Sequence, residues 1–477
     1  MINILYFIYI LVFNFCLAFY LISALQWYSY RLKRVAFHYH NYLWHFYFLF
    51  VPYLIYILSF GFSYIGLIYF CFIHATILYF WNKKIDKKLV LTSKVKWFFV
   101  FVFILNFLFC ILSYKFSFLL NLLTLPSALF CLKIYDFFSN FYFKQKAKNK
   151  ISKIKNLKII LITASFGKTS IKNFLYELLK DDFSVHKTPR SVNTFLGIVK
   201  DINENLSLDT QIYIVEAGAR LKGDILQITS FLNPEICIVG EIGKAHLEYF
   251  KSEENIRQTK LEALQSLNLK KAFLHSSTKE SENDTKIIYD KALKQSISSL
   301  EGLKFQVKIN DELVDFKANL LGEFNAENLC VCLLVASYLG LKNEKLQRIC
   351  EKIPSVEHRL QILQKKPKFI IDDGFNGNFK GMSQSYELCK SYKGRKILVS
   401  PGIVEVNKEE NIRLCTLINE CFDLAIITAK SNAEIFKKEL KIENIILKEK
   451  SELVEILAKH TKDGDLILFS NDAPSYL

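Results

Sequence analysis

The sequence predicts an N-terminal membrane region of α-helices, followed by α/β domains built on parallel sheets. Two features of the 477 residues indicate this organisation: long apolar stretches fill the first third, and short apolar runs alternate with helical segments in the rest. Charge is divided in the same way, because residues 1–150 contain 15 of the 62 Lys and Arg residues but only two of the 46 acids. A basic excess confined to the apolar third favours a lipid bilayer, and not nucleic acid, as the partner.

Five apolar stretches of the first third are long enough to cross a bilayer, which takes about 17–25 residues of helix. They cover approximately residues 3–28, 43–60, 62–81, 97–114 and 116–132. Clusters of Lys and Arg follow the first, third and fifth stretches, so the positive-inside rule places the N-terminus outside and the chain from residue 134 onward in the cytoplasm. Residues 1–143 are therefore predicted to be a transmembrane region of about five helices.

Three alternatives, a cleaved signal peptide, a water-soluble helical bundle and a disulfide-linked secreted protein, are disfavoured by the sequence. A cleaved signal peptide is disfavoured because no basic residue precedes the first stretch and no A-x-A site follows it. A helical bundle in water is disfavoured because Glu is absent from residues 1–150. The 11 cysteines include no C-x-x-C pair, so we interpret them as buried or idle thiols in a reducing compartment and not as a disulfide framework.

The remainder of the chain alternates strand-like and helical segments, which is typical of parallel α/β sheets. The apolar runs that we interpret as buried strands cover residues 157–162, 212–215, 236–239, 369–371, 397–399, 424–427 and 466–469. Residues 144–158 are interpreted as a basic linker. Pro354 and Ser355 interrupt the pattern after a predicted helix that ends near Cys350, which places a domain boundary at about 354–358.

The string Thr163-Ala164-Ser165-Phe166-Gly167-Lys168-Thr169-Ser170 lies between a predicted strand and a predicted helix. This is the context of a phosphate-binding loop, in which backbone N–H groups and the helix N-terminus hold phosphates. Lys168 is expected to contact the outer phosphates, and the Thr169 hydroxyl is expected to reach Mg²⁺. The alternative, a chance G-K-T-S at a helix start, is disfavoured by the strand and helix on either side.

Three further polar residues are candidates for binding a metal or a phosphate. Glu216 ends a predicted strand, and doubly wound sheets bind their ligands at the carboxyl ends of strands. We therefore interpret Glu216 either as a ligand of a metal on the phosphates or as a solvated loop carboxylate. His246 follows the next strand and is either a metal ligand or a surface histidine. Lys260 lies in a helical stretch, and periodicity alone makes it an ordinary helix lysine.

Two pairs of residues complete the set. Asn325 and Asn328 lie one turn apart on one face of an apolar helix, where their amides could read an adenine edge or cap the helix. Asp372 and Asp373 end another predicted strand, where they could meet a cation, a ribose or an amine. The Gly and Asn residues that follow them predict a tight turn.

Taken in chain order, these strings resemble the Mur ligase family, the ATP-dependent amide-bond-forming enzymes of peptidoglycan synthesis. The matching strings are T-x-x-x-G-K-T, N-T-F-L-G, E-A-G, A-H-L-E, a downstream Lys, G-x-x-N-x-x-N, H-R and D-D-x-x-N-x-N. The resemblance covers about residues 157–402 well, and the remainder less clearly. The strings D-D-x-F-N-x-N and E-A-G-A-x-x-x-G-D look most like those of members that add D-Ala-D-Ala to UDP-N-acetylmuramoyl-tripeptide.

The resemblance implies a fold and an activity. It implies a P-loop central domain with a parallel sheet over residues 144–354 and a Rossmann-like C-terminal domain over residues 355–477. It also implies ATP and Mg²⁺ as cofactors, an acyl-phosphate intermediate, and UDP-N-acetylmuramoyl-tripeptide and D-Ala-D-Ala as substrates. Together with the apolar third, it places the protein in the bacterial cytoplasmic membrane as a multi-pass protein, with its catalytic domains on the cytoplasmic side.

The family's site residues are carried over to this sequence position by position. The catalytic residues that the resemblance implies are Lys168, His246 and Lys260. The implied ATP-binding residues are Thr163, Gly167, Lys168, Thr169, Ser170, Asn325, Asn328, Arg359 and Asp373. The implied metal ligands are Thr169, Glu216, His246 and Lys260, the last of which matches a lysine that family members carbamylate with CO₂. The implied substrate-binding residues are Asn193, Asn376 and Asn378.

The sequence departs from the family pattern in several places. Ala164 replaces a glycine of the phosphate loop, and Gly374 stands where the family usually has Ser. The family's soluble N-terminal domain, which binds the UDP part of the substrate, is replaced by the apolar region. Two alternatives therefore stay open: a related ligase that acts on a lipid-linked or polymeric acceptor, and a membrane ATPase that is not a ligase. The absence of Asp, Glu, Lys and Arg inside the spans argues against a translocation path.

Overall fold

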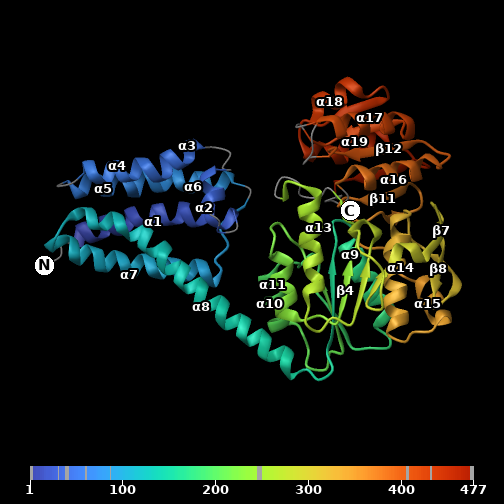
Figure 1. Ribbon diagram of the computed structural model, residues 1–477. Coiled ribbons are helices and arrows are strands. Elements are labelled where there is room, and N and C mark those ends of the chain that lie inside the picture. The colour runs from blue at the N-terminus through green and yellow to red at the C-terminus, as the bar shows by residue number, and fades with distance from the viewer. Residues whose placement is uncertain are drawn as a thin grey trace. The chain divides into compact units, whose positions relative to one another are not determined.

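The computed structural model describes residues 4–28, 30, 32–37, 42–59, 62–85, 87–243, 250–375, 377–403, 408–429 and 432–472. The chain divides into two compact units, Met1–Lys144 and Gln145–Leu477. Figure 1 shows that the first unit is helical and that the second contains the strands. The fold of each unit is described separately below.

The described residues of the first unit form helices and the short segments between them. Two of its α-helices contain more than 20 residues, α1 (Ile4–Trp27) and α7 (Ser93–Lys115), and α8 (Thr124–Lys153) begins in this unit. The shorter elements are α2 (Leu32–Phe37), α3 (Tyr42–His45), η1 (Phe46–Phe50), α4 (Val51–Leu58), α5 (Ser63–Ile68), η2 (Tyr69–His74), α6 (Ala75–Lys84) and η3 (Phe118–Leu123).

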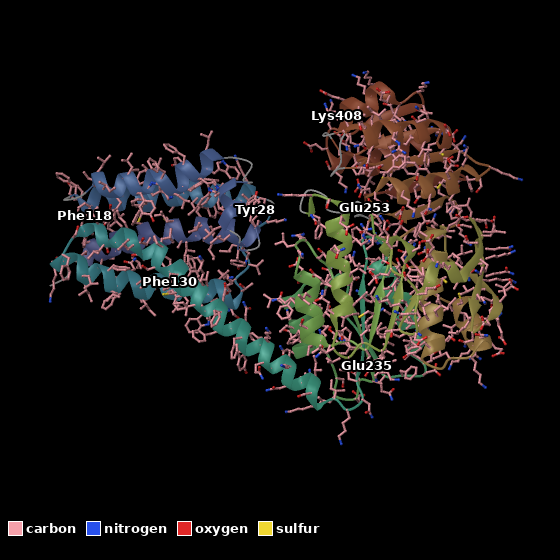
Figure 2. The ribbon with its side chains drawn as sticks, viewed as in Figure 1. Tyr28, Phe118, Phe130, Glu235, Glu253 and Lys408 are labelled. Atoms are coloured by element: carbon pink, nitrogen blue, oxygen red, sulfur yellow. The ribbon has the colours of Figure 1, made fainter. Side chains whose placement is uncertain are left out.

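Aromatic rings form the interior of this unit and also cover its surface. The rings of Phe13 and Tyr56 stack with their centroids 4.6 Å apart, and Phe70 packs against Phe13 at 5.3 Å. Many other large apolar side chains remain exposed, Phe130 among them, as Figure 2 shows along α8. A helical unit that is apolar both inside and outside has the composition of a membrane-spanning bundle.

Four helical segments among the described residues are long and apolar enough to cross a membrane. They are Ile4–Trp27, Tyr64–Lys84, Ser93–Lys115 and Phe118–Lys153. All five predicted stretches are helical over most of their described residues, but the second, Leu43–Leu58, forms a shorter apolar helix. Residues 144–153 of the predicted basic linker are helical and form the end of α8, since no Pro or Gly follows Pro126 to stop the helix before Asn156.

The second unit begins with a six-stranded parallel sheet in the order β2-β3-β1-β4-β5-β6. The strands are β1 (Lys158–Thr163), β2 (Val185–Lys187), β3 (Ile212–Glu216), β4 (Ile236–Val239), β5 (Lys271–Leu274) and β6 (Lys286–Ile288). The chain leaves β1 toward β2 and β3 on one side and later adds β4 on the other. The carboxyl end of β1 therefore lies at a topological switch point, where α/β sheets bind ligands.

Helices cover both faces of this sheet, as successive residues of β1 indicate. Ile160 and Ile162 pack with α9 (Lys168–Leu179), α14 (Phe324–Tyr338) and α15 (Asn343–Cys350), whereas Ile159 and Leu161 pack on the opposite side. The helices of that side are α10 (Phe195–Glu204), α11 (Asp224–Leu232) and α13 (Glu253–Leu261). Short η4 (Glu262–Gln265), η5 (Ser276–Thr278) and η6 (Tyr289–Ala292) complete this part.

A three-stranded antiparallel sheet was not predicted. It contains β7 (Leu293–Ser299), β8 (Gly302–Ile309) and β9 (Glu312–Ala318). Residues of β8 and β9 alternate between buried and exposed, and the turn between these strands uses Asn310 and Asp311 in left-handed conformation. This alternation and turn are the ordinary signals of a hairpin, and they were present in the sequence.

The second six-stranded sheet has the order β10-β11-β15-β12-β13-β14, with only β10 antiparallel. Its strands are β10 (Gln361–Gln364), β11 (Phe369–Asp373), β12 (Lys396–Ser400), β13 (Leu424–Ile427), β14 (Glu443–Ile446) and β15 (Leu466–Ser470). The flanking helices are α16 (Phe379–Lys390), α17 (Lys408–Cys421), α18 (Ala433–Glu439) and α19 (Leu453–His460), with a short η8 (Lys450–Glu452). The predicted parallel α/β architecture is confirmed.

Candidate functional site

The loop between β1 and α9, residues 164–167, has the form of a phosphate-binding loop. Gly167 precedes the first turn of α9 with φ +77°, a left-handed conformation that favours glycine. A Cβ atom at this position would lie 2.5 Å from Oδ1 of the buried Asn328 side chain. The backbone can therefore approach α14 closely here only because residue 167 has no side chain. The N-terminus of α9 opens onto this loop, as an anion-binding site requires.

Lys168 folds its side chain back over this phosphate loop. Its Nζ donates hydrogen bonds to the carbonyl oxygens of Ala164 at 2.7 Å and Ser165 at 3.2 Å. Burial lowers the pKa of Lys168 to about 8, an effect that the Glu216 carboxylate opposes and the Arg359 charge reinforces. Among the described residues, the recorded hydrogen-bond acceptors of the Lys168 ammonium group are these two carbonyl oxygens, which the oxygens of a phosphate could replace.

Glu216 ends β3 beside the phosphate loop and is almost completely buried. Its Oε2 accepts hydrogen bonds from the Thr169 hydroxyl at 3.0 Å and from Lys172 Nζ at 2.9 Å. Its Oε1 accepts from Asn193 Nδ2 at 3.0 Å. The structure thus joins Thr169, Asn193 and Glu216, as the predicted site requires. Lys172 was missed, although it lies one turn after Lys168 on the same helix, a spacing that brings two side chains to one face.

Lys260 occupies the last turn of α13 and is 4% exposed. Among the described residues, its ammonium group has no recorded hydrogen bond or ion pair. Burial and, to a smaller extent, the positive charge of Lys168 lower its pKa to about 7, against the opposing effects of Asp224, Glu216 and Glu262. Lys260 is therefore not an ordinary surface lysine of a helix, which was the interpretation that periodicity alone supported.

Arg359 brings a further positive charge to the same place from the segment before β10. Burial lowers its pKa, and the carboxylates of Asp373 and Glu216 oppose this effect. Asp373 is itself held by the backbone N–H of Leu360 at 3.1 Å and by the Ser385 hydroxyl at 2.6 Å. Three cations, Lys168, Lys260 and Arg359, thus act on one another or on Glu216, which is the electrostatic arrangement of an anion-binding site.

The two asparagines of α14 lie behind the phosphate loop. Asn325 Nδ2 donates to the carbonyl of Leu321 at 2.8 Å, and Asn328 Nδ2 lies 3.4 Å from Asn325 Oδ1. Both side chains are buried. Asn328 directly faces Gly167, so α14 is fixed against the loop whose glycine it contacts.

The remaining predicted residues have varied positions. Thr163 is buried at the end of β1, and its hydroxyl has no hydrogen-bond partner among the described residues. Ser170 is buried in the first turn of α9. Asn378 caps α16 by accepting a hydrogen bond from the Gly381 N–H at 2.9 Å. His246 and Asn376 lie outside the described residues.

A complete metal-binding cluster is not formed by the described part of the chain. No group of three or more His, Cys, Asp or Glu side chains among those residues could hold a metal ion. The potential oxygen ligands that do lie together are the Glu216 carboxylate and the Thr169 hydroxyl, which are joined by their hydrogen bond. Because Mg²⁺ retains several waters and takes ligands from phosphates, two protein ligands at a phosphate loop are consistent with its ordinary coordination.

Comparisons with known proteins agree with this geometry. Residues 162–336 match the Mur ligase middle domain. The UDP-N-acetylmuramoyl-tripeptide–D-alanyl-D-alanine ligase of Bacillus subtilis is 26% identical over 340 residues, 65% of this chain and 72% of that protein. The ligase of the same name from Buchnera aphidicola subsp. Baizongia pistaciae is 26% identical over 349 residues, 66% of this chain and 75% of that protein.

Solved structures with similar folds cover about two thirds of the chain. The MurF ligase of Thermotoga maritima in complex with ADP gives a TM-score of 0.61 at 23% identity, covering 69% of this chain and 80% of that one. A MurF structure from Acinetobacter baumannii gives a TM-score of 0.59 at 20% identity, covering 69% and 77%. At these identities, the structural matches establish a shared fold.

Proposed function

We propose, from the match of residues 162–336 to the Mur ligase middle domain, that the protein is an ATP- and Mg²⁺-dependent ligase that adds D-Ala-D-Ala to UDP-N-acetylmuramoyl-tripeptide. The relatives with this printed activity support the choice of substrates. The observation that carries the proposal is the convergence of a phosphate loop, the buried Glu216 and three cations at the carboxyl edge of the first sheet.

The residues at the loop fit a nucleoside triphosphate. The N-terminal amides of α9 and the Lys168 ammonium group would bind the phosphates, and Asn325 and Asn328 would flank the adenine side. Arg359 and Asp373 would contact the nucleotide from the second sheet. Thr169 and Glu216 would hold Mg²⁺, which would neutralise charge on the transferring phosphoryl group.

The reaction that this geometry supports has two steps. In the first, an oxygen of the tripeptide carboxylate attacks the γ-phosphorus of ATP, and the bond to ADP breaks. Lys168 and Arg359 stabilise the negative charge that develops on the phosphoryl oxygens. In the second, the amine of D-Ala-D-Ala attacks the carbonyl carbon of the acyl phosphate, a tetrahedral intermediate expels phosphate, and the amine nitrogen loses a proton. Exclusion of water from the site protects the acyl phosphate from hydrolysis.

Lys260 is proposed to act as a carbamate. Its amine is buried and has a lowered pKa, so near neutral pH a large fraction is the uncharged form that can attack CO₂. The product replaces a cation by an anion. Since Lys168 repels the ammonium form of Lys260, the change converts an unfavourable contact in the cation cluster into a favourable one. The carbamate oxygens would then extend the metal-binding set that Thr169 and Glu216 begin.

The first unit is proposed to anchor the ligase in the bacterial cytoplasmic membrane, with the second unit on the cytoplasmic side. Four long apolar helices support a multi-pass arrangement by their length and composition. The Lys and Arg clusters between the apolar stretches support the orientation. ATP and the nucleotide-linked substrate are both cytoplasmic solutes, so this orientation gives the site access to them.

Phosphate release by detergent-purified full-length protein tests the proposal. ATP and Mg²⁺ are supplied with UDP-N-acetylmuramoyl-tripeptide, with D-Ala-D-Ala, with both, and with neither. We expect release that requires both substrates, accompanied by the pentapeptide product. Release that is independent of both would contradict the ligase and favour an ATPase, whereas release only with a lipid-linked acceptor would reassign the substrate.

A further inference from the structure

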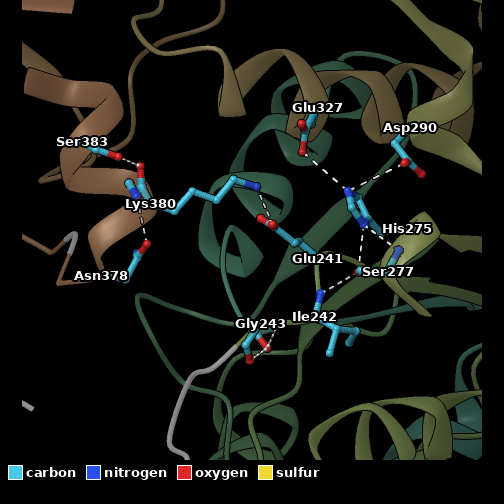
Figure 3. Close-up of polar contacts among 12 residues, drawn as sticks. Glu241, Ile242, Gly243, His275, Ser277, Asp290, Glu327, Asn378, Lys380 and Ser383 are labelled. Atoms are coloured by element: carbon cyan, nitrogen blue, oxygen red, sulfur yellow. Dashed lines mark hydrogen bonds and ion pairs between the residues drawn. The ribbon is translucent and has the colours of Figure 1, made fainter. Parts of the chain in front are cut away.

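An ion pair connects the two parallel sheets of the second unit beside the phosphate loop. Lys380, in the first turn of α16, places its Nζ 2.5 Å from Oε1 of Glu241, which follows β4 after one glycine. The two residues are 139 positions apart in the chain. Figure 3 shows the lysine side chain extended from α16 across to Glu241.

The position of Lys380 is not explained by its own helix. The N-terminus of an α-helix carries partial positive charge, which disfavours a lysine in the first turn. Asn378 already caps this helix, accepting from the Gly381 N–H at 2.9 Å. The favourable partner of the Lys380 charge is therefore Glu241 on the other sheet.

The surroundings of Glu241 attract a cation. His275 lies nearby, 3.8 Å from a carboxylate oxygen of Asp290 and 3.7 Å from one of Glu327. Three carboxylates and one histidine thus gather around this end of the first sheet, as Figure 3 shows. Lys380 supplies positive charge to a place where acids outnumber bases.

The loop of Glu241 is connected directly to the phosphate loop. The Ser165 N–H donates to the Glu241 carbonyl at 2.8 Å, and the Ser165 hydroxyl and the Gly243 backbone are hydrogen bonded at 3.0 Å. The Ile242 N–H donates to the Ser277 hydroxyl at 2.9 Å, which also connects the loop to η5, the short helix that follows β5. A Cβ at Gly243 would lie 2.6 Å from the Phe166 ring, so residues 241–243 pack tightly on the phosphate loop.

We propose that the Lys380–Glu241 ion pair is a latch that holds the second sheet, with Arg359 and Asp373, in its catalytic position over the phosphate loop. The inference rests on the proposed ligase function and deepens it by assigning Lys380 and Glu241 as positioning residues. Because Glu241 contacts the phosphate loop through its backbone, changing its side chain opens the latch without breaking the hydrogen bonds to Ser165. Loss of the latch therefore lowers turnover and leaves nucleotide binding by the first sheet in place.

Charge exchange in the full-length, detergent-purified protein tests the latch. Lys380→Glu places two carboxylates together, and we expect turnover to fall by about tenfold. The double exchange Lys380→Glu with Glu241→Lys restores the opposite charges, and we expect it to recover at least half of the wild-type turnover. The Kd for Mg-ADP should rise in Lys380→Glu by less than turnover falls, because the first sheet keeps its phosphate contacts while the contacts of Arg359 and Asp373 with the nucleotide are weakened, and it should return toward the wild-type value in the double exchange.

A matched control is the Lys345–Asp182 pair, whose atoms are 2.6 Å apart and which joins α15 to the turn after α9. Both partners pack with the first sheet, so Lys345→Glu should leave turnover unchanged. If turnover of Lys380→Glu equals that of the wild type, or if the double exchange is as slow as the single variant, the latch is wrong.

Amide hydrogen exchange separates failure of the latch from failure of the ligase. In Lys380→Gln, which keeps a long polar side chain without charge, we expect several-fold faster exchange in residues 240–243 and in the first turn of α16. Unchanged exchange would overturn the latch. Wild-type protein that shows no ligation, but whose exchange still depends on Lys380, would refute the ligase and retain the latch.

Discussion

Glu216 is the residue on which the geometry of the site depends. Its two oxygens accept hydrogen bonds from three side chains, two on α9 and one on the loop before α10, and they include a buried ion pair with Lys172 in which both side chains are at most 2% exposed. A buried carboxylate is tolerated only when its charge is compensated. Lys172 therefore compensates the buried charge of Glu216, while Lys168 remains available to bind phosphate.

Lys172→Met is expected to destabilise the second unit by about 3–5 kcal/mol, because it leaves Glu216 buried without its cation. Urea unfolding followed by circular dichroism measures the loss. Lys180→Met is the control, since Lys180 directly follows the same helix and pairs with Glu177 in a more exposed position. That pair should contribute less than about 1 kcal/mol. An equal loss in the free energy of unfolding of the two variants would contradict this prediction, because the buried pair would then contribute no more to stability than the more exposed one.

The ligation rate is expected to depend on pH in a bell-shaped way, because one lysine of the site must be deprotonated and another must be protonated. Lys260, with a pKa lowered to about 7, must lose its proton to react with CO₂, so the rate should rise with pH through that value. Lys168, with a pKa lowered to about 8, must keep its proton to bind phosphate, so kcat/KM for ATP should fall above that value. Bound phosphate raises the pKa of Lys168, so the falling limb of kcat should lie at higher pH than that of kcat/KM.

Initial rates at a fixed dissolved CO₂ concentration between pH 6 and 9 measure this profile. Lys260→Ala should abolish ligation, with partial recovery in added bicarbonate only if the shorter side chain leaves room for it. Full activity of Lys260→Ala would remove Lys260 from the mechanism, and a flat profile would contradict both assignments.

At the scale of elements, the sequence predicted seven of the eight internal strands of the two large sheets and missed the edge strands. The internal strand that it missed is β5, which has only four residues. The seven predicted runs correspond to β1, β3, β4, β11, β12, β13 and β15. Each of these strands has a neighbouring strand on both sides in one of the two large sheets. Edge strands such as β2, β6, β10 and β14 are short and only partly buried, so they lack a continuous apolar run. The hairpins of β7–β9 carried an alternating pattern that was not used.

The residues of the site were also predicted in part and missed in part. The phosphate loop and Glu216 were found because a contiguous string and a strand end carry their signal. Lys172 and the Lys380–Glu241 pair were missed, because a helix lysine has no local signal and the latch joins residues that only the fold brings together. The burial of Lys260 likewise depends on packing between α13 and the rest of the first sheet's layer, which periodicity does not contain.

Gly167→Ala tests how the phosphate loop and α14 fit together. The substitution adds a left-handed strain of about 1–2 kcal/mol and a Cβ 2.5 Å from the Asn328 side chain. Gly340→Ala is the matched control, because Gly340 also has positive φ, at +102°, but nothing lies within 4 Å of its Cβ position. Both variants should lose stability in urea. Only Gly167→Ala should also lose Mg-ADP affinity, by about tenfold or more, and equal affinity in the two would contradict the assignment of the loop.

At the scale of the whole molecule, the two units differ in the surface that they present. The first exposes many large apolar side chains along its long helices, and the second has an ordinary balance of Lys, Arg, Asp and Glu. A monomeric soluble protein rarely exposes apolar surface on this scale. We expect the first unit to be covered by lipid.

Alkaline carbonate extraction of bacterial membranes from cells expressing the full-length protein tests that expectation. An integral multi-pass protein remains in the pellet at high pH and is released by detergent, because its apolar helices have no favourable state in water. A variant without residues 1–143 should appear in the soluble fraction. Release of the full-length protein by carbonate alone would contradict a membrane-spanning first unit and leave only peripheral attachment.

The central claim is that a carboxylate is activated by ATP and captured by an amine, and the path of oxygen tests it most directly. UDP-N-acetylmuramoyl-tripeptide labelled with ¹⁸O in both oxygens of the accepting carboxylate is incubated with full-length protein, Mg-ATP and D-Ala-D-Ala, and the products are weighed by mass spectrometry. The account predicts that one ¹⁸O appears in the released phosphate and the other remains in the new amide of the pentapeptide. Unlabelled phosphate, or release without pentapeptide, would contradict it.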